Sequence, residues 1–341
     1  MSSKPIVLVT GANGYIAGPV IEAFLKAGYA VRGTVRSKSS ADPLSQTLSH
    51  QVPSILRSRV SASSIYEDLN LTISGIHAIV HLAAGVSLSF TDPEPVLEVA
   101  IQGTLGVLES AITESSVKSV VLMSSIASII NGSKEAPARF TEADWNDEAL
   151  EAVKKLGKES PSLLIYAASK VASERAFWKF RDERSPSFTM TALNPVFVMG
   201  PQPGLESTSK IGGTTAFIWQ ILSGQEIPKP LTPNPGYVDV RDIARVAVFS
   251  VDHPDKANGD RFLLASGLVP PQAAADVLRK VYPERQDIIK AGTPGQGYFP
   301  GYEFPEDRVL DASKAVKLTG QDFYPVEQTI IDTAKSFEKF L

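Results

Sequence analysis

The feature that most constrains this chain is a glycine-rich turn directly after its first apolar run. Residues 6–9 read Ile-Val-Leu-Val, which predicts a strand buried on both faces. The turn that follows reads Thr10-Gly11-Ala12-Asn13-Gly14-Tyr15-Ile16-Ala17. The glycines permit a tight turn and let backbone N–H groups approach a pyrophosphate, while the small Ala17 lets helix and strand pack closely. In this context the pattern predicts a dinucleotide-binding turn rather than an ordinary turn that contains glycine, with the nucleotide at Gly11, Asn13, Gly14, Tyr15 and Ile16.

In the rest of the first two-thirds of the chain, short apolar runs alternate with amphipathic stretches. A helical stripe from Ala17 to Leu25 ends at Gly28. Further strands are expected at residues 29–35, 77–82, 120–123 and 188–193, with helices at 95–111 and 166–180. This alternation predicts an α/β fold, a Rossmann-type doubly wound parallel sheet.

The end of the second strand bears on which dinucleotide binds. An enzyme for NAD places an acid there to accept from the ribose 2′-hydroxyl. Residues 31–38 instead read Val-Arg-Gly-Thr-Val-Arg-Ser-Lys, with three cations and no acid. Arg32 and Arg36 are suited to clamp a 2′-phosphate, and the alternative is a solvated basic edge. The segment favours NADPH/NADP+ over NAD(H).

The amino-acid composition of the chain changes after Asn194. Fifteen of the 24 prolines lie beyond residue 190, so long regular elements become scarcer, although helices are expected at 212–222, 241–251 and 272–281. We therefore predict an NADP-binding Rossmann domain over residues 1–194, to which segments around 236–265 return. Residues 195–341 are expected to form mainly a smaller C-terminal substrate-binding cap.

A tyrosine and a lysine four residues apart mark a second candidate site. On a helix Tyr166 and Lys170 share one face, and the ammonium stabilises the phenolate, which makes the phenol a better proton donor. The alternative is a surface tyrosine beside a solvated lysine. Ser124 and Ser125 follow the apolar run 120–123, at the sheet edge where ligands of α/β folds bind. We favour Ser125 for orienting a substrate carbonyl, while Ser124 satisfies backbone groups.

Composition excludes several other chemistries. The chain has no cysteine, so disulfides, thiolate metal sites and a cysteine nucleophile are ruled out, and it has only four histidines. No metal site is therefore predicted. A net charge of −4 gives no reason to expect nucleic acid or a membrane surface as a partner. Because neither a targeting leader nor an 18-residue apolar run is recognised, we expect a cytoplasmic location. As the oligomeric state we expect a monomer or a homodimer.

Together these motifs resemble the extended short-chain dehydrogenase/reductases, in particular the dihydroflavonol reductase-like branch with its fungal and yeast aldehyde, ketone and methylglyoxal reductases. The resemblance runs over nearly the whole chain. Besides the segments above it rests on the stretches His81-Leu82-Ala83-Ala84, Gly103-Thr104, Trp178-Lys179-Phe180, Asn194 to Pro201, Tyr237 to Asp242 and Asp311 to Lys314.

The resemblance implies a role for each matching residue. Tyr166 is the acid, Lys170 assists it and holds the nicotinamide ribose, and Ser125 orients the carbonyl. The remaining cofactor contacts that it implies are made by Leu82, Ala83, Ala84, Pro195 and Val198. Hydride then passes from NADPH to a small aldehyde or ketone, including keto esters and aryl ketones.

Two departures from the family pattern qualify the resemblance. The expected third strand at residues 60–64 lacks the aspartate that many relatives place near adenine, and Ala100 stands where many carry an asparagine. His81, at a strand end, is favoured as a packed residue over a catalytic base. The alternative functions are a sugar-nucleotide epimerase or dehydratase and a non-catalytic NADP-sensing protein.

Overall fold

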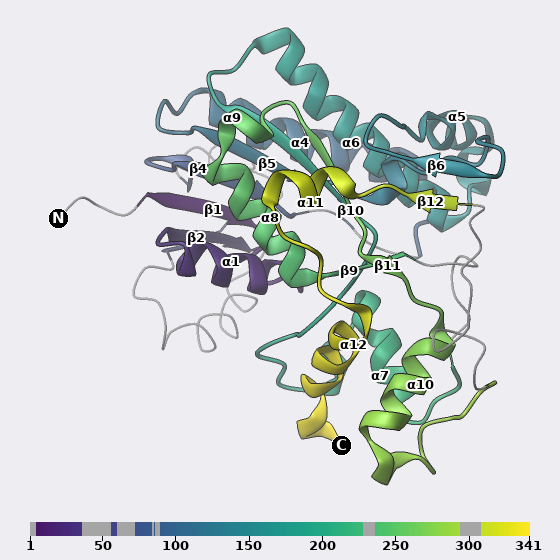
Figure 1. Ribbon diagram of the computed structural model, residues 1–341. Helices are drawn as coiled ribbons and strands as arrows, with labels where there is room; N and C mark the ends of the chain where they lie inside the picture. The colour runs from purple at the N-terminus through teal and green to yellow at the C-terminus, as the bar shows by residue number, and fades with distance from the viewer. Residues whose placement is uncertain are drawn as a thin grey trace. The chain divides into compact units, whose positions relative to one another are not determined.

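The computed structural model describes residues 5–35, 56–59, 72–83, 85, 89–227, 236–293 and 308–341. Its centre is a seven-stranded sheet with the strand order β10-β7-β5-β4-β1-β2-β3 (Figure 1). Adjacent strands from β3 to β7 pair in parallel. The strands are β1 (Ile6–Thr10), β2 (Ala30–Val35), β3 (Leu56–Arg59), β4 (Ala78–His81), β5 (Ser119–Met123), β7 (Thr189–Pro195) and β10 (Arg261–Leu264).

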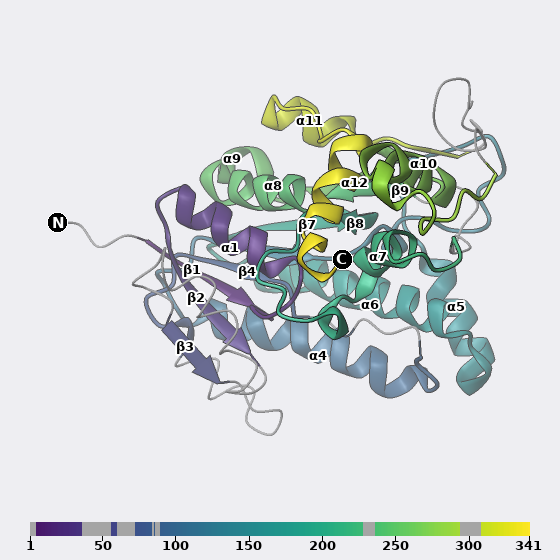
Figure 2. The same ribbon diagram turned by 90° about the horizontal axis from the view of Figure 1, so that it is seen from below.

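Helices cover both faces of this sheet. Figure 2 shows α4 (Pro93–Ile112) and α6 (Ser162–Arg184) side by side on one face, with α5 (Asp147–Leu156) packed on α6. The opposite face carries α1 (Ala17–Lys26), α8 (Val240–Asp252) and α9 (Pro254–Ala257). The predicted α/β class, a doubly wound Rossmann-type sheet, is confirmed.

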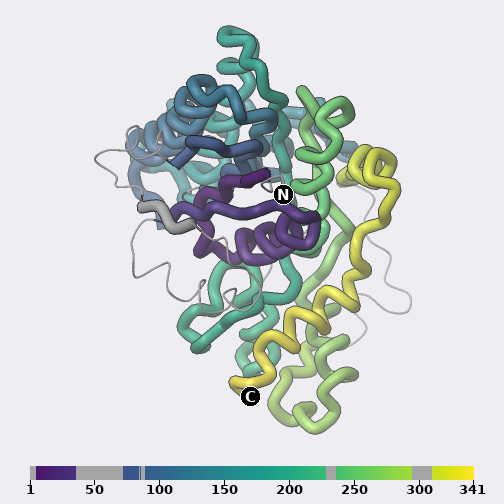
Figure 3. Tube along the Cα trace, turned by 90° about the vertical axis from the view of Figure 1, so that its left-hand side faces the viewer, coloured from purple at the N-terminus to yellow at the C-terminus, as the bar shows by residue number. Residues whose placement is uncertain are grey.

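Local sequence explains where these elements begin and end. The residues of β4 and β5 are all buried, as expected of central parallel strands. Helix α1 connects β1 to β2 and lies against both (Figure 3). The chain leaves it through Gly28, whose φ of +93° only glycine adopts readily. Helix α4 begins at Pro93, where the Asp92 carboxylate accepts from the backbone N–H of Glu94.

One predicted element lies outside the described residues, and another differs from the structure. Strand β3 occupies Leu56–Arg59, just before the predicted segment 60–64, which lies outside the described residues. The polar sequence around it carries no two-residue alternation that could locate a strand. Helix α6 is longer than predicted: it begins at Ser162, directly after its N-cap residue Pro161, and ends at Arg184.

Helix α4 is, among the described helices, the one long and apolar enough to cross a membrane, judged by length and composition alone. It packs against α6, and Thr104 Oγ1 lies 2.7 Å from Ser173 Oγ of that helix. Its apolar residues Val107, Leu108 and Ala111 belong to the core beneath the sheet. The expectation of no membrane partner stays a prediction.

The chain divides into two compact units. The first comprises residues 1–135, 140–194 and 244–263 and contains the seven-stranded sheet, and the second comprises 136–139, 195–243 and 264–341. The second unit contains the three-stranded sheet β11-β9-β8 and helices that share one apolar core. Its elements are β8 (Phe197–Met199), α7 (Ala216–Leu222), β9 (Gly236–Asp239), β11 (Gly267–Leu268), α10 (Pro271–Val281), α11 (Ser313–Thr319) and α12 (Val326–Lys335), with β12 (Arg308–Leu310) paired to β6 (Ala138–Phe140). The assignment of NADP and substrate binding to separate domains stays a prediction.

Candidate active site

The parallel register aligns the ends of four strands at one edge of the sheet. Thr10 of β1 pairs with His81 of β4, which pairs with Leu122 of β5. One residue further, Met123 pairs with Leu193 of β7. The residues after these strand ends therefore lie along the carboxyl edge, where α/β folds bind their ligands.

The glycine-rich turn occupies this edge directly after β1. Gly11 has a φ of +66°, and a Cβ added there would lie 3.1 Å from the Cα of Ala83. The N–H of Ala12 donates to the carbonyl of Thr34, which draws the turn across the end of β2. A side chain at Gly33 would lie 2.7 Å from the Cβ of Ala12, so this glycine also belongs to the turn's packing.

The first turn of α1 is built to receive an anion. The helix begins after Ile16, which has no side-chain capping bond, and its first turn contains no acidic residue. Helix N-terminal N–H groups without side-chain caps, at the positive end of the helix dipole, are suited to a pyrophosphate. The residues present therefore fit the predicted dinucleotide. The individual contacts of Gly11, Asn13, Gly14, Tyr15 and Ile16 stay predictions.

One hydroxyl joins the ends of β1 and β4. Thr10 Oγ1 accepts from the backbone N–H groups of Leu82 and Ala83, both at 3.1 Å, and lies 2.8 Å from His81 Nδ1. A hydroxyl has two lone pairs and one hydrogen, so the hydrogen is donated to Nδ1. The imidazole is thus neutral, with its proton on Nε2. Burial, and then the charge of Lys170, lower the pKa of His81 to about 4. This geometry makes His81 a packed residue rather than a base at neutral pH.

Of the two arginines predicted to bind a 2′-phosphate, the structure describes Arg32. The Arg32 guanidinium donates through one nitrogen to the carbonyl oxygens of Thr72 and Ser74. These carbonyls precede β4, at the amino edge of the sheet, so the position of the Arg32 side chain does not support its predicted phosphate contact. Arg36 and Ala84 lie outside the described residues.

Tyr166 and Lys170 meet on one face of α6. The Lys170 ammonium lies 5.9 Å from the centroid of the Tyr166 ring and 3.4 Å from the carbonyl oxygen of Met123, the last residue of β5. Lys170 is buried, whereas Tyr166 is partly exposed. Within the described part of the chain, the Tyr166 hydroxyl has no hydrogen-bond partner. The pair therefore lies at the carboxyl edge, with a phenol proton available for transfer.

The structure distinguishes the two serines after β5. Ser124 Oγ donates to the Glu174 carboxylate at 2.5 Å, so its proton is already committed. Ser125 Oγ accepts from the backbone N–H of Ala127 at 3.1 Å, and no acceptor for its own proton occurs among the described residues. Ser125 is thus the serine with a free donor, whereas Ser124, which was expected to satisfy backbone groups, binds the Glu174 side chain. The role of Ser125 toward a substrate carbonyl stays a prediction.

Pro195 and Val198 belong to the second unit. Pro195 ends β7, and Val198 lies in β8, where it pairs with Val238 of β9. The Val198 carbonyl accepts from the hydroxyl of Thr214. Their contacts with the nicotinamide stay predictions carried over from the resemblance.

Sequence reasoning missed several residues that organise this edge. Thr10 joins two strand ends, Gly33 makes room for the turn, and Glu174, Asn194 and Arg261 form a buried polar network beside Ser125. Two of them had a local signal. Gly33 is a glycine inside a strand, which often marks close backbone approach, and Glu174 continues the four-residue spacing of Tyr166 and Lys170.

The fold and the site define the class of protein. A family model described as the NAD dependent epimerase/dehydratase family matches residues 7–265. The chain therefore belongs to this family, in agreement with the predicted resemblance to extended short-chain dehydrogenase/reductases.

Two relatives and one solved structure are similar to the chain over most of its length. The chain is 30% identical to the NADPH-dependent methylglyoxal reductase GRE2 of Saccharomyces cerevisiae, over 98% of both chains. It is 33% identical to aldehyde reductase 2 of Sporidiobolus salmonicolor, over 86% of this chain and 85% of the relative. Among solved structures, the yeast methylglyoxal/isovaleraldehyde reductase Gre2 complexed with NADPH is similar, with a TM-score of 0.85, 28% identity and 98% of both chains covered.

Proposed function

We propose that this protein is an NADPH-dependent reductase of small aldehydes or ketones, with Tyr166 as proton donor. The observation that carries the proposal is the placement of three groups at one sheet edge. Lys170 joins the end of β5, Tyr166 lies on the same helical face, and the Ser125 hydroxyl retains a free proton. The names of the full-length relatives support both the reaction and the cofactor.

Each residue has a separate chemical task in this proposal. When bound, NADPH supplies a hydride to the carbonyl carbon of the substrate. Ser125 donates a hydrogen bond to the carbonyl oxygen and orients it. Tyr166 transfers its phenolic proton to that oxygen as negative charge develops, so that a carbonyl, a hydride and a proton yield an alcohol. The Lys170 ammonium stabilises the tyrosinate that remains.

The cofactor is held by the turn after β1. The first N–H groups of α1 are suited to the pyrophosphate, and Arg36 is the residue we assign to the 2′-phosphate, since Arg32 is bound elsewhere. Leu82, Ala83 and Ala84, together with Pro195 and Val198, complete the proposed cofactor contacts.

Replacing the proton donor tests the proposal most directly. For Tyr166→Phe we expect kcat for carbonyl reduction to fall by roughly 10²- to 10⁴-fold, because general acid catalysis is lost while NADPH binding is retained. Steady-state kinetics and a fluorescence titration with NADPH measure the two quantities. Tyr324→Phe removes the hydroxyl of an exposed tyrosine in the second unit and serves as the matched control. A kcat of the wild-type size for Tyr166→Phe would contradict the assignment of the acid.

A substrate panel tests the reaction class. NADPH consumption is measured with aldehydes, keto esters and aryl ketones, and with NADH in parallel. Turnover with NADPH and little with NADH supports the reductase and the 2′-phosphate assignment. Equal rates with both cofactors contradict the cofactor preference alone. NADPH binding without oxidation by any carbonyl contradicts the reductase and leaves the epimerase, dehydratase or sensing alternatives.

Several properties remain part of the proposal. We assign a small carbonyl compound as substrate, a cytoplasmic location and a monomeric or homodimeric state, without nucleic acid or membrane partners.

A further inference from the structure

A buried carboxylate continues the catalytic face of α6. Glu174 lies four residues after Lys170 and eight after Tyr166, and residues at this spacing share one side of a helix. Its side chain is completely buried. A carboxylate in that position requires hydrogen bonds and a countercharge, and the proposed proton transfer uses neither of its oxygens.

One oxygen of Glu174 binds the groups on either side of Ser125. Oε2 accepts from Ser124 Oγ at 2.5 Å, Ser128 Oγ at 2.6 Å and Asn194 Nδ2 at 2.8 Å. The Ser128 hydroxyl shares its one hydrogen between Oε2 and the Ser125 carbonyl oxygen, which lies 2.8 Å from Ser128 Oγ. Asn194 Nδ2 also donates to that carbonyl, at 3.3 Å. The backbone around Ser125 is therefore tied to the helix that carries the catalytic tyrosine.

Arg261 supplies the countercharge for the other oxygen. Its Nε donates to Glu174 Oε1 at 2.6 Å, and its side chain is 8% exposed. A second guanidinium nitrogen donates to the carbonyls of Glu142 and Asp144 at 2.8 and 2.6 Å. The guanidinium lies 3.8 Å from the Trp145 ring. Arg261 thus joins the carboxylate to the 142–145 loop.

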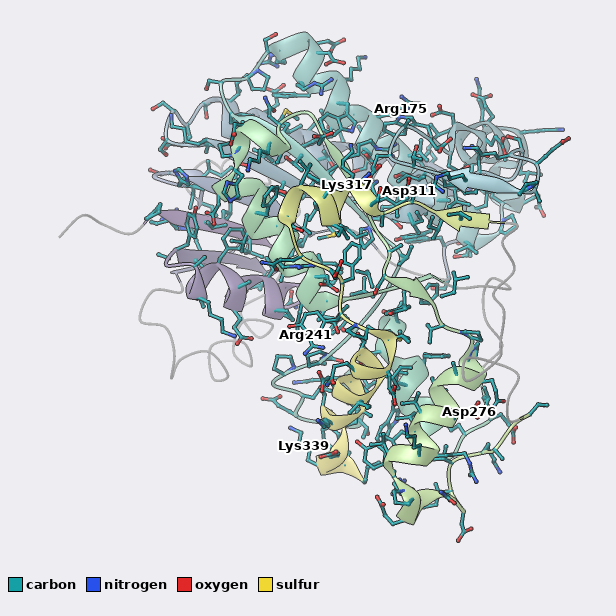
Figure 4. The ribbon with its side chains drawn as sticks, viewed as in Figure 1. Arg175, Arg241, Asp276, Asp311, Lys317 and Lys339 are labelled. Atoms are coloured by element: carbon teal, nitrogen blue, oxygen red, sulfur yellow. The ribbon has the colours of Figure 1, made fainter. Side chains whose placement is uncertain are left out.

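A second arginine holds the same loop to α6. Arg175, labelled in Figure 4, lies 3.7 Å from the Trp145 ring and forms hydrogen bonds with Asp147. Trp145 therefore contacts the guanidinium groups of both Arg175 and Arg261. These contacts restrict how far Arg261 can move from Glu174.

We propose that Glu174, neutralised by Arg261, is a positioning residue that sets the direction of the Ser125 hydroxyl toward the substrate carbonyl. Neither side chain touches substrate in this scheme, and the inference rests on the proposed reductase function. Glu174 Oε2 accepts from Arg261 Nη2 at 3.3 Å, and its three shorter hydrogen bonds come from Ser124, Ser128 and Asn194, which flank Ser125 or bind its carbonyl. A substitution at Glu174 therefore displaces the side chains that are bonded to or adjacent to Ser125, and no apolar core residue lies between them.

The test is a double-mutant cycle on kcat. Ser125→Ala lowers kcat by about 10²-fold, the cost of losing one donor to a developing oxyanion. Glu174→Gln keeps the shape but places an amide where donors require an acceptor, and kcat falls about tenfold or more through misplacement of Ser125. If Glu174 acts through Ser125, adding Ser125→Ala to Glu174→Gln lowers kcat by much less than 10²-fold. The dissociation constant for NADPH stays within about twofold. A lower kcat with unchanged NADPH affinity is a result that general unfolding would not produce.

Two further variants complete the design. Glu183→Gln changes an exposed glutamate at the far end of the same helix and is the matched control. Ser128→Ala removes one bridging hydroxyl without leaving a charge unpaired, and it replaces Glu174→Gln in the cycle if that variant does not fold.

The outcomes separate the two proposals. Multiplicative effects in the cycle, or wild-type kcat in folded Glu174→Gln and Ser128→Ala, overturn the positioning role while the reductase stands. No turnover by the wild-type protein with any carbonyl overturns the reductase itself, and the positioning role with it.

Discussion

At the scale of single residues, the Thr10 hydroxyl governs the protonation of His81. Because the hydroxyl accepts from two backbone N–H groups, its one hydrogen points at Nδ1. A proton on Nδ1 would break that bond inside a buried site close to the Lys170 ammonium. The hydrogen bond between Thr10 and His81 at these strand ends therefore forms only while this histidine is neutral.

This arrangement predicts a loss of stability in mild acid. The pKa of His81 is about 4 in the folded protein, against an ordinary value of 6.5. Between these values the unfolded chain binds a proton that the folded chain does not, so the free energy of unfolding rises with pH and levels off above 6.5. We expect His81 to contribute about 2 kcal/mol of lost stability between pH 7.5 and pH 5. Urea denaturation across this range measures the slope.

His81→Asn provides the comparison. The asparagine Oδ1 can accept from Thr10 as Nδ1 does, but the side chain does not titrate. The difference in unfolding free energy between wild type and variant should therefore change with pH over this window. Parallel curves for the two proteins would show that His81 is not the group responsible.

At the scale of elements, the turn between β1 and α1 depends on close backbone approach. Gly11 combines a φ of +66° with contact to Ala83, whereas Gly28, after the same helix, has a φ of +93° and open space around its Cβ position. The two glycines thus have the same conformational requirement in different surroundings. Their comparison separates backbone strain from displacement of the turn.

For Gly11→Ala we expect the NADPH dissociation constant to rise at least about tenfold, because the added methyl pushes the turn from the end of β4. Gly28→Ala should leave the dissociation constant unchanged. Both variants should lose about 1–2 kcal/mol of stability from the left-handed conformation. Fluorescence titration and urea denaturation measure these values. Equal NADPH affinity in the two variants would show that the contact with Ala83 has no part in binding.

Helix α6 serves as the frame for the proposed site. Tyr166, Lys170 and Glu174 follow one another at four-residue steps and therefore lie on one side of the helix. In our proposals Tyr166 transfers the proton, Lys170 supplies a positive charge, and Glu174 positions Ser125. A rigid helix is a more exact support for such a set than a loop.

At the scale of the whole molecule, ligand binding should stabilise the folded chain. A ligand that binds only the folded state at 100 times its dissociation constant adds about 2.7 kcal/mol. We expect NADPH to raise the unfolding temperature by several degrees, and NADH at the same concentration to raise it less. Thermal unfolding with each cofactor measures this. Equal shifts would contradict a preference for the 2′-phosphate.

The sequence by itself determined the features that depend on neighbouring residues. Apolar runs predicted the central strands, the glycine pattern predicted the turn after β1, and the spacing of Tyr166 and Lys170 placed both on one helical face. These signals are local, because strand alternation, helical periodicity and turn geometry arise within a few residues. The α/β class and the family resemblance followed from them.

Only the tertiary structure decided which side chains meet across the fold. Glu174 and Arg261 are separated by 87 positions and form one buried pair, which no local pattern encodes. The same pair's network commits the Ser124 proton and leaves that of Ser125 free. Arg32 was expected at a phosphate but donates to carbonyls before β4, because its partner atoms come from a distant turn. The residue types and their spacing indicate which side chains are candidates for the site. Long-range packing determines which hydrogen bonds those side chains form.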